Sequence, residues 1–270
     1  MQSDDLRATL DQHIRATWWP HKNWGDNLNP WLINKLSGGK LVEFCEASDK
    51  RPKYACVGSI MNRVLNENVT VWGSGMLARN EPFDHNATFL AVRGPLTREV
   101  ILERGGQCPP IYGDPALLVP SLYYPAEHKK KFNVGFIPHY IDQGLFDIDN
   151  PLYTVIDITL PIKQFVDRVL ECDVILSSTL HGIICAHSYG VPAQWIKMSD
   201  NLAGDGIKFK DYFLSVGQEP QQCINLARGG DIKKIVNNVP NVIMDIDLMP
   251  LLDACPFYNV NEGDDFNDFA

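Results

Sequence analysis

The 270-residue sequence lacks a long apolar run, since no segment approaches the roughly 20 consecutive apolar residues that a membrane-spanning helix requires. Its first ten residues include Asp4, Asp5 and Arg7 and no apolar core, so they match neither a secretory signal peptide nor a transit peptide. Glycine (20) and proline (18) are too few for a low-complexity or fibrous chain. We therefore expect a globular cytoplasmic protein, with a peripheral position at the inner face of the membrane left open.

Positive charge is scarce as well. Lys and Arg number 24 against 33 Asp and Glu, which gives a net charge of −9. A field of this sign repels polyanions, so we expect no nucleic acid partner, although a local basic pocket can still hold a small anion. The sequence G-x-x-x-x-G-K-[ST] does not occur, which excludes a P-loop nucleotidase.

Patterns typical of metal sites and disulfide frameworks are also missing. The seven cysteines are an odd number without a C-x-x-C pair, so we expect reduced thiols, as in cytosolic proteins. Two D-x-D pairs, Asp147 with Asp149 and Asp245 with Asp247, have no further oxygen ligands nearby to complete a hard-cation site. We therefore expect no bound metal.

What the chain does contain is an alternation of β-branched or aromatic runs with helical segments, which is typical of α/β proteins with a mainly parallel sheet. A helix is predicted over 95–103, with Pro95 at its first position and Gly105 and Gly106 after its end. A helix over 30–36 is expected after a loop over 20–29, with Asn29 as its N-cap. The other expected strands are 14–19, 54–58, 69–72, 87–92, 111–118, 133–137, 153–158, 174–178 and 193–196, and the other expected helices are 60–65, 161–171, 180–189, 209–216 and 231–239.

The apolar periodicity breaks over residues 120–131, where we expect a linker between two domains. The two α/β halves are of similar size, which favours two Rossmann-like domains, 1–125 and 126–258, facing a ligand cleft. Residues 259–270 form an acidic tail that we expect to be disordered.

Polar residues gather where predicted strands end. Asn23, Gly25 and Asp26 lie in the loop before a helix that Asn29 already caps, so Asp26 is a candidate base or hydroxyl acceptor, with a helix-capping carboxylate as the alternative. Arg93 lies between a strand and a helix N-terminus, which suits an anion site, and a structural ion pair is the alternative.

A hydroxyl-rich segment follows another predicted strand and leads into an apolar helix: Ser177, Ser178, Thr179, Leu180 and His181. Its hydroxyls and amides can bind an anion, and His181 can add a proton or a positive charge, although a buried capping histidine is the alternative. His139 is a second histidine at a strand end, where a structural role competes. By letters alone, residues 73–78 match the dinucleotide pattern G-x-G-x-x-A, but Pro82 ends the following segment, so a tight turn is favoured.

Five motifs occur in a fixed order along the chain: Asn23-Trp-Gly-Asp26, Val92-Arg93-Gly-Pro-Leu-Thr97, Tyr112-Gly-Asp114-Pro115-Ala-Leu117, Ile137-Pro-His139-Tyr140 and Ser177-Ser-Thr-Leu-His181-Gly. As a set, from about residue 23 to residue 213, they resemble the polysaccharide pyruvyl transferase family. The resemblance implies transfer of a pyruvyl group from phosphoenolpyruvate to two hydroxyls of a galactose-like hexose as a cyclic ketal, in surface polysaccharide biosynthesis. It also implies a GT-B-like fold and no cofactor, since phosphoenolpyruvate is the donor substrate.

Roles for individual residues follow from the same resemblance. Arg93 matches the family's phosphoenolpyruvate-binding arginine, His181 its anion-binding or acid histidine, and Lys208 a functional lysine of some members. Thr179 stands where many members carry arginine, which removes one positive charge expected at the phosphate. Replacing His181 or Arg93 by alanine is then expected to abolish transfer and leave folding intact.

The mechanism that we expect begins with phosphoenolpyruvate held by Arg93 and the 177–181 segment. His181 or His139 protonates the enol carbon, and Asp26 accepts a proton from the attacking sugar hydroxyl. Two alternatives stay open, a GT-B-type sugar-nucleotide glycosyltransferase and a non-catalytic saccharide-binding protein. In each case Trp18, Trp19 and Trp24 can stack on sugar faces, with a core role as the alternative for Trp18 or Trp19, and the saccharide acceptor can be lipid-linked.

Overall fold

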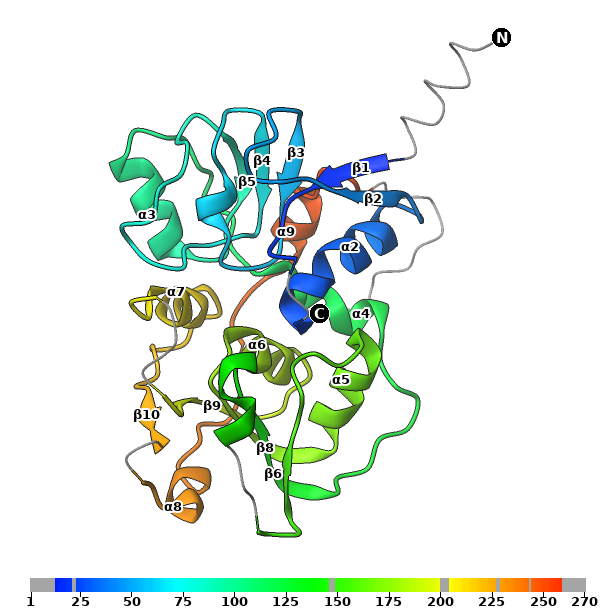
Figure 1. Cartoon of the computed structure of the whole chain (residues 1–270), viewed down its shortest axis with the longest axis vertical. Coiled ribbons are helices and arrows are strands. Elements are labelled where there is room, and N and C mark those ends of the chain that lie inside the picture. Colours follow the sequence, from blue (N-terminus) through cyan, green and yellow to red (C-terminus); the bar gives the residue numbers. More distant parts are fainter. Residues whose placement is uncertain are drawn as a thin grey trace.

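The computed structural model describes residues 13–20, 23–145, 149–199, 204–226, 229–242 and 244–258, so the expected acidic tail lies outside the described residues. Within these ranges the chain forms two five-stranded sheets, one above the other in Figure 1, and every strand pair is parallel. The first sheet has the order β2-β1-β3-β4-β5 and the second has the order β10-β9-β8-β6-β7. The strands are β1 (His13–Ala16), β2 (Leu41–Phe44), β3 (Lys53–Ala55), β4 (Val69–Trp72), β5 (Thr88–Ala91), β6 (Phe132–Ile137), β7 (Tyr153–Val155), β8 (Cys172–Ser177), β9 (Ala193–Lys197) and β10 (Ile224–Asn225).

The two sheets have the same topology. Counted from the first strand of each half, both follow the order 2-1-3-4-5, which is a doubly wound arrangement. In such sheets ligands bind beyond the carboxyl ends of the first and third strands, where the strand order reverses. The structure therefore confirms two Rossmann-like α/β units and marks the ends of β1 and β3, and of β6 and β8, as the places for a site.

Helical segments connect the strands and cover the sheets (Figure 1). The helix predicted over 95–103 is confirmed, whereas the strand predicted over 111–118 is wrong. There, only Tyr112 bridges to Val92, and Asp114 caps a 3-10 turn. The helical segments are α2 (Trp24–Leu36), η1 (Met61–Arg63), α3 (Pro95–Glu103), η2 (Pro115–Leu118), α4 (Val119–Leu122), η3 (Tyr140–Leu145), α5 (Ile162–Leu170), α6 (Leu180–Ser188), α7 (Ile207–Ser215), α8 (Ile232–Val236) and α9 (Met249–Asp253).

Helix α2 begins six residues earlier than the sequence predicts. Asn23 is its N-cap and accepts a hydrogen bond from the Asp26 amide at 3.0 Å, and Pro30 lies inside the helix. A proline there leaves the carbonyl four residues earlier without its amide donor. The Asn29 side chain donates to that Asp26 carbonyl (3.3 Å) and also bonds both backbone groups of Val57 (3.0 and 2.9 Å). Asn29 is thus a clamp within the helix and not its cap, which moves residues 24–29 from a loop into the first turns.

The start of α2 and helix α9 both make contacts between the halves of the molecule. Trp24 at the start of α2 is fully buried, lies tilted against Phe165 of α5 (5.2 Å between ring centroids) and donates to the Ile162 carbonyl at 3.2 Å. Helix α9 returns to the upper sheet in Figure 1, where the Leu251 carbonyl accepts a hydrogen bond from Trp72 at 2.8 Å. The domain boundary predicted at 125/126 stays a prediction. Helix α9, near the end of the predicted second domain, packs on the first sheet.

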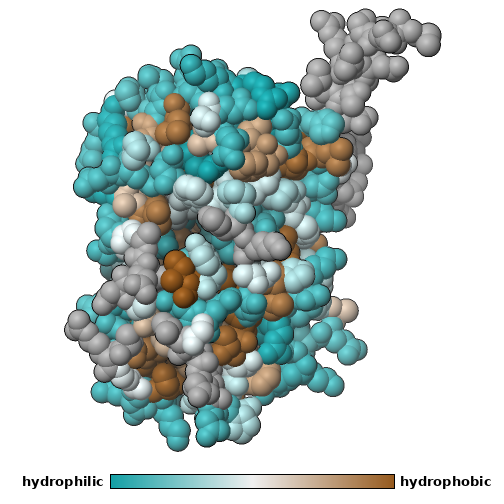
Figure 2. Space-filling view, viewed as in Figure 1, coloured by the Kyte–Doolittle hydropathy of each residue, from teal (hydrophilic) through white to brown (hydrophobic). Residues whose placement is uncertain are grey.

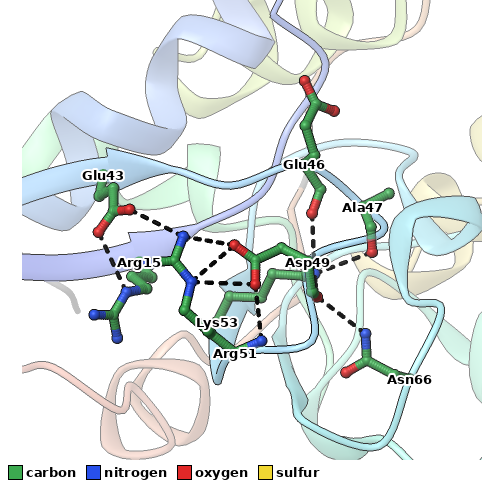
Figure 3. Close-up of polar contacts among 8 residues, drawn as sticks. All are labelled: Arg15, Glu43, Glu46, Ala47, Asp49, Arg51, Lys53 and Asn66. Atoms are coloured by element: carbon green, nitrogen blue, oxygen red, sulfur yellow. Dashed lines mark hydrogen bonds and ion pairs between the residues drawn. The ribbon is translucent and has the colours of Figure 1, made fainter.

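A buried lysine shapes the loop after β2. Lys53 is 2% exposed, and its ammonium group donates to the carbonyls of Glu46 and Ala47, both at 3.0 Å, and of Asp49 (Figure 3). Arg51, two residues before Lys53, is exposed and pairs with Asp49 and Glu43 on the surface. The loop is therefore organised around one ammonium group.

We expect Lys53→Met to lower the free energy of unfolding by about 3 kcal/mol, because it removes one charged donor from three partly buried carbonyls and leaves the Ala47 carbonyl without its donor. The matched control, Arg51→Met, removes only exposed ion pairs and should change the same quantity by less than about 1 kcal/mol. Urea unfolding of both variants measures the difference. Equal, small effects would show that the three carbonyls do not depend on Lys53.

Candidate functional site

A cavity of about 310 Å³ lies where the two sheets present the carboxyl ends of their first and third strands. Trp19 follows β1, Ser59 follows β3, His139 follows β6 and His181 follows β8. The other lining residues are Asn23, Asp26, Leu77, Tyr140, Ile141, Ile158, Thr179, Leu180 and Lys208. On the face drawn in Figure 2, hydrophilic side chains cover most of the surface, and several hydrophobic side chains show along the boundary between the halves. The cavity thus lies at the point of each sheet where the strand order reverses, which is where a doubly wound topology places ligands.

The predicted residues at 23–26 form the first turn of α2. Asn23 accepts from the Asp26 amide, and its own amide group donates to the Asp26 carboxylate. Asp26 is 7% exposed and lines the cavity, so it is at once part of the helix cap and a cavity carboxylate. Gly25 has a steric role, because a methyl group there would overlap the ring of His181. Because Gly25 has no side chain, the His181 ring can occupy this space.

His181 is the second residue of α6, and its side chain is 15% exposed. Its Nε2 lies 3.6 Å from Oδ2 of Asp114, which is beyond hydrogen-bond distance, and neither atom has another hydrogen-bond partner among the described residues. Asp114 is fully buried, and its other oxygen accepts from the Ala116 amide at 3.0 Å. The sequence predicted no role for Asp114. Its position in the motif over residues 112–117 is the signal that could have identified it.

The segment 177–180 divides into two pairs. Ser177 and Ser178 are buried and hold the loop, since Ser177 Oγ donates to the Thr179 carbonyl (2.9 Å) and Ser178 Oγ accepts from the His139 amide (2.8 Å). Thr179 is the N-cap of α6 and accepts from the Gly182 amide at 3.0 Å. Thr179 and Leu180 line the cavity, whereas the two serines, predicted to bind substrate, lie within the loop.

Arg93 is fully buried and is not among the residues that line the cavity. Its guanidinium donates to Ser59 Oγ and to the Met76 carbonyl, both at 2.7 Å, and its Nε lies 3.3 Å from Asp211, which is also fully buried. A methyl group at Gly75 would overlap the guanidinium, so this glycine of the G-x-G pattern makes room for Arg93. The structure therefore shows Arg93 as a structural ion pair, with Ser59 as its contact to the cavity.

Asp211 connects the two halves. It lies on α7, and besides facing Arg93 it accepts from the Thr97 amide (3.0 Å) and hydroxyl (2.6 Å) in the first turn of α3. Figure 1 shows α7 directly beneath α3. Arg93, Thr97 and Asp211 thus form a buried polar contact between the halves.

The cavity contains two further basic groups, His139 and Lys208. Burial lowers the pKa of His139 to about 4, with the nearby positive charge of Lys208 contributing and Asp142 opposing. Burial, together with the charge of Arg93, lowers the pKa of Lys208 to about 8. At pH 7, His139 is therefore neutral and Lys208 is mostly charged. Among the described cavity residues, Lys208 is the one lysine or arginine.

The described part of the chain holds no group of three or more His, Cys, Asp and Glu side chains placed to bind a metal ion, and Asp147 of the first D-x-D pair lies outside that part. Within the same residues, no helix combines the length and apolarity needed to span a bilayer. All seven cysteines, which are described, are unpaired.

Known proteins provide an independent comparison. Residues 59–199 match the polysaccharide pyruvyl transferase family. The chain is 32% identical over 213 residues to an uncharacterized protein of Acanthamoeba polyphaga mimivirus, covering 74% of this chain and 73% of that protein. It is 27% identical over 210 residues to the succinoglycan biosynthesis protein ExoV of Rhizobium meliloti, covering 73% of this chain and 62% of that protein, which is less than two thirds of its length.

One solved structure is also similar, that of a functionally uncharacterized protein of Klebsiella pneumoniae. It aligns with a TM-score of 0.49 and 13% sequence identity over 83% of this chain and 99% of the other. The segment matched by the family, in contrast, contains cavity residues from both halves of the molecule, among them Ser59, His139 and His181.

Proposed function

Because the chain belongs to the polysaccharide pyruvyl transferase family, we propose that it transfers a pyruvyl group from phosphoenolpyruvate to two hydroxyls of a galactose-like hexose, forming a cyclic ketal. One observation above all supports this proposal. A single cavity between two Rossmann-like units brings together a carboxylate (Asp26), a histidine beside a buried acid (His181) and a cation (Lys208). A reaction that needs proton donation, proton removal and anion binding requires these three kinds of group.

The donor binds through positive charge at the start of α6 and on α7. Leu180 and His181, the first residues of α6, line the cavity, and the N-terminus of a helix carries partial positive charge that favours phosphate. Lys208 adds a full charge. Together they compensate for the arginine that the family resemblance leads one to expect at Thr179.

His181 is the proton donor. His139, with its pKa near 4, is uncharged at neutral pH and is therefore the weaker acid, whereas His181 lies beside the buried carboxylate of Asp114. His181 protonates carbon 3 of phosphoenolpyruvate, carbon 2 becomes electrophilic, and the first sugar hydroxyl attacks it while Asp26 takes the hydroxyl proton. Phosphate then leaves with the C–O bond electrons and takes the proton held by Asp26. The second hydroxyl attacks carbon 2 and passes its proton to His181, which closes the ketal and restores the donor.

The acceptor saccharide packs on aromatic side chains at the edge of the cavity. Trp19 is 37% exposed and Tyr140 is 42% exposed, and they come from different halves of the molecule. Aromatic rings with exposed faces bind the apolar face of a pyranose. Of the other predicted stacking residues, Trp24 is fully buried and Trp18 packs edge-on against Phe44 at 4.9 Å, so both serve the core.

The test uses the full chain with phosphoenolpyruvate and a galactose-terminated oligosaccharide, and it measures phosphate release and the mass of the acceptor. We expect acceptor-dependent phosphate release in step with addition of a pyruvyl group. UDP-galactose is the control donor. Sugar transfer from UDP-galactose would identify a glycosyltransferase instead, and saccharide binding without either reaction would identify a non-catalytic binding protein.

The pH dependence of donor binding follows from Lys208. Because its pKa is about 8 in the free protein and a bound phosphate raises it, binding above pH 8 requires uptake of a proton. The affinity for phosphoenolpyruvate should therefore fall as the pH rises above 8. In Lys208→Arg, which stays charged, this loss should disappear, and in Lys208→Met binding at pH 7 should weaken about 10- to 100-fold.

Isothermal titration calorimetry between pH 7 and 9.5 measures these affinities. Lys210→Met is the matched control, because Lys210 lies on the same helix and is exposed. A pH profile that is the same in the wild type and in Lys208→Arg would remove Lys208 from the donor site.

A further inference from the structure

Asp114 holds an ionisable oxygen for which the fold does not account. The residue is fully buried, and capping of η2 uses only Oδ1, which accepts from the Ala116 amide at 3.0 Å. Oδ2 is buried and has no hydrogen-bond partner among the described residues. A buried carboxylate oxygen without a donor is costly, because desolvation is not compensated. A cap alone is satisfied by a serine or an asparagine, so the second oxygen calls for another explanation.

The atom nearest to that oxygen, among the polar contacts described, is Nε2 of His181. The two atoms are 3.6 Å apart, and Nε2 is likewise buried without a hydrogen-bond partner. The histidine ring is held against Gly25, where a methyl group would overlap it, so the ring has little freedom to turn away. Hydrogen bonds of catalytic groups are often long in ligand-free proteins and shorten when the reacting state forms.

We propose that Asp114 is the positioning residue of the proton-donating histidine. It holds His181 in the tautomer that carries a proton on Nε2, stabilises the imidazolium form, and leaves Nδ1 to exchange the proton with substrate. This inference rests on the proposed function for the role of His181, but the pairing itself is a property of the protein without substrate. The physical reason is that a carboxylate beside one ring nitrogen favours both a proton on that nitrogen and a positive charge on the ring.

Other charged and titratable groups surround the pair and set the controls. Asp26 on α2 is the second carboxylate, since a methyl group at Gly58 would lie 3.9 Å from both Asp26 Oδ1 and His181 Cε1. Lys208 on α7 and His139 before η3 line the same cavity as His181. Burial raises the pKa of Tyr212 on α7, the charge of Asp114 contributes, and the Tyr212 hydroxyl is 3.1 Å from Nδ1 of His187.

The test is an NMR titration of the full chain labelled with ¹⁵N-histidine, with the His181 signals assigned from their absence in His181→Gln. In the wild type we expect the neutral ring to carry its proton on Nε2. In Asp114→Asn, which keeps the size and the cap oxygen, the pKa of His181 should fall by at least about one unit, that is tenfold in the protonation equilibrium, and the tautomer should change. Asp26→Asn is the control that removes the other carboxylate, and it should leave the tautomer unchanged.

The activity readout is separate. In Asp114→Asn, kcat for pyruvyl transfer should fall about 100-fold or more with its acidic pH limit displaced, and KM for phosphoenolpyruvate should change less than about threefold. If Asp114→Asn does not fold, the same titration is made with Asp114→Ser, which retains an oxygen that can cap η2. An unchanged pKa and tautomer of His181 in a folded variant would overturn the inference. Because the titration needs no substrate, absence of pyruvyl transfer in the wild type would contradict the proposed function alone.

Discussion

His181→Gln should lower kcat for pyruvyl transfer about 100- to 10,000-fold at pH 7, the range that a general acid contributes. Glutamine fills a similar volume but cannot take a positive charge, so it supplies no proton to the enol carbon. The unfolding free energy should change little, because Nε2 of His181 has no hydrogen-bond partner among the described residues and the side chain reaches the cavity. Steady-state phosphate release and urea unfolding of the same preparation measure the two quantities.

His187→Gln is the matched control for this result. His187 lies on the same helix, is 2% exposed, and contacts the Tyr212 hydroxyl at 3.1 Å, outside the cavity. Burial lowers the pKa of His187 to about 4, so it is a neutral core histidine. Its replacement should reduce stability and leave kcat within about threefold. A His181→Gln protein with near wild-type kcat would remove His181 from the chemistry and leave His139 as the donor to be tested next.

Arg93→Met should lower the free energy of unfolding by about 3–5 kcal/mol, the effect of removing one partner of a buried ion pair. The sequence predicted that loss of Arg93 would abolish transfer without affecting folding. The structure changes that expectation, because Arg93 and Asp211 are both fully buried and methionine leaves the Asp211 carboxylate without its guanidinium. Activity should also be lost, since Ser59 of the cavity is held by Arg93 at 2.7 Å.

A double variant separates burial of the charge from binding of substrate. Arg93→Met with Asp211→Asn removes both charges, and part of the lost stability should return. Arg98→Met is the control, because this partly buried arginine of α3 bonds only the Cys108 carbonyl among the polar contacts described (2.9 Å) and should cost about 1 kcal/mol. Full stability of Arg93→Met with loss of phosphoenolpyruvate binding would restore the predicted role of Arg93 as a donor-site residue.

Prediction from sequence was accurate where the determining interactions are local. The helix over 95–103 has its proline at the first position and its glycines after the end, and the structure reproduces both limits. It failed at α2, because Pro30 is tolerated only where Asn29 replaces the missing donor and Val57, 28 residues away, holds Asn29. No local pattern contains that contact.

The candidate site divides in the same way. Polar residues after apolar strands predicted Asp26, His139, Thr179 and His181, because strand ends at a reversal of strand order meet at one edge whatever the details of packing. Which side chains face the cavity depended on neighbours that are distant in the chain. The serines at 177 and 178 are occupied by loop hydrogen bonds that only the folded loop creates.

The sequence by itself determined the α/β class, the doubly wound halves and the family, since hydrophobic periodicity and ordered motifs are properties of the chain. The tertiary structure decided the electrostatics. Arg93 meets Asp211 across 118 positions and Asp114 meets His181 across 67, because α7 and α6 of the second half pack against the first. Burial and charge pairing depend on these long-range contacts. Burial and charge pairing in turn decide whether a charged side chain binds a ligand, sets the protonation of a histidine or holds the halves together.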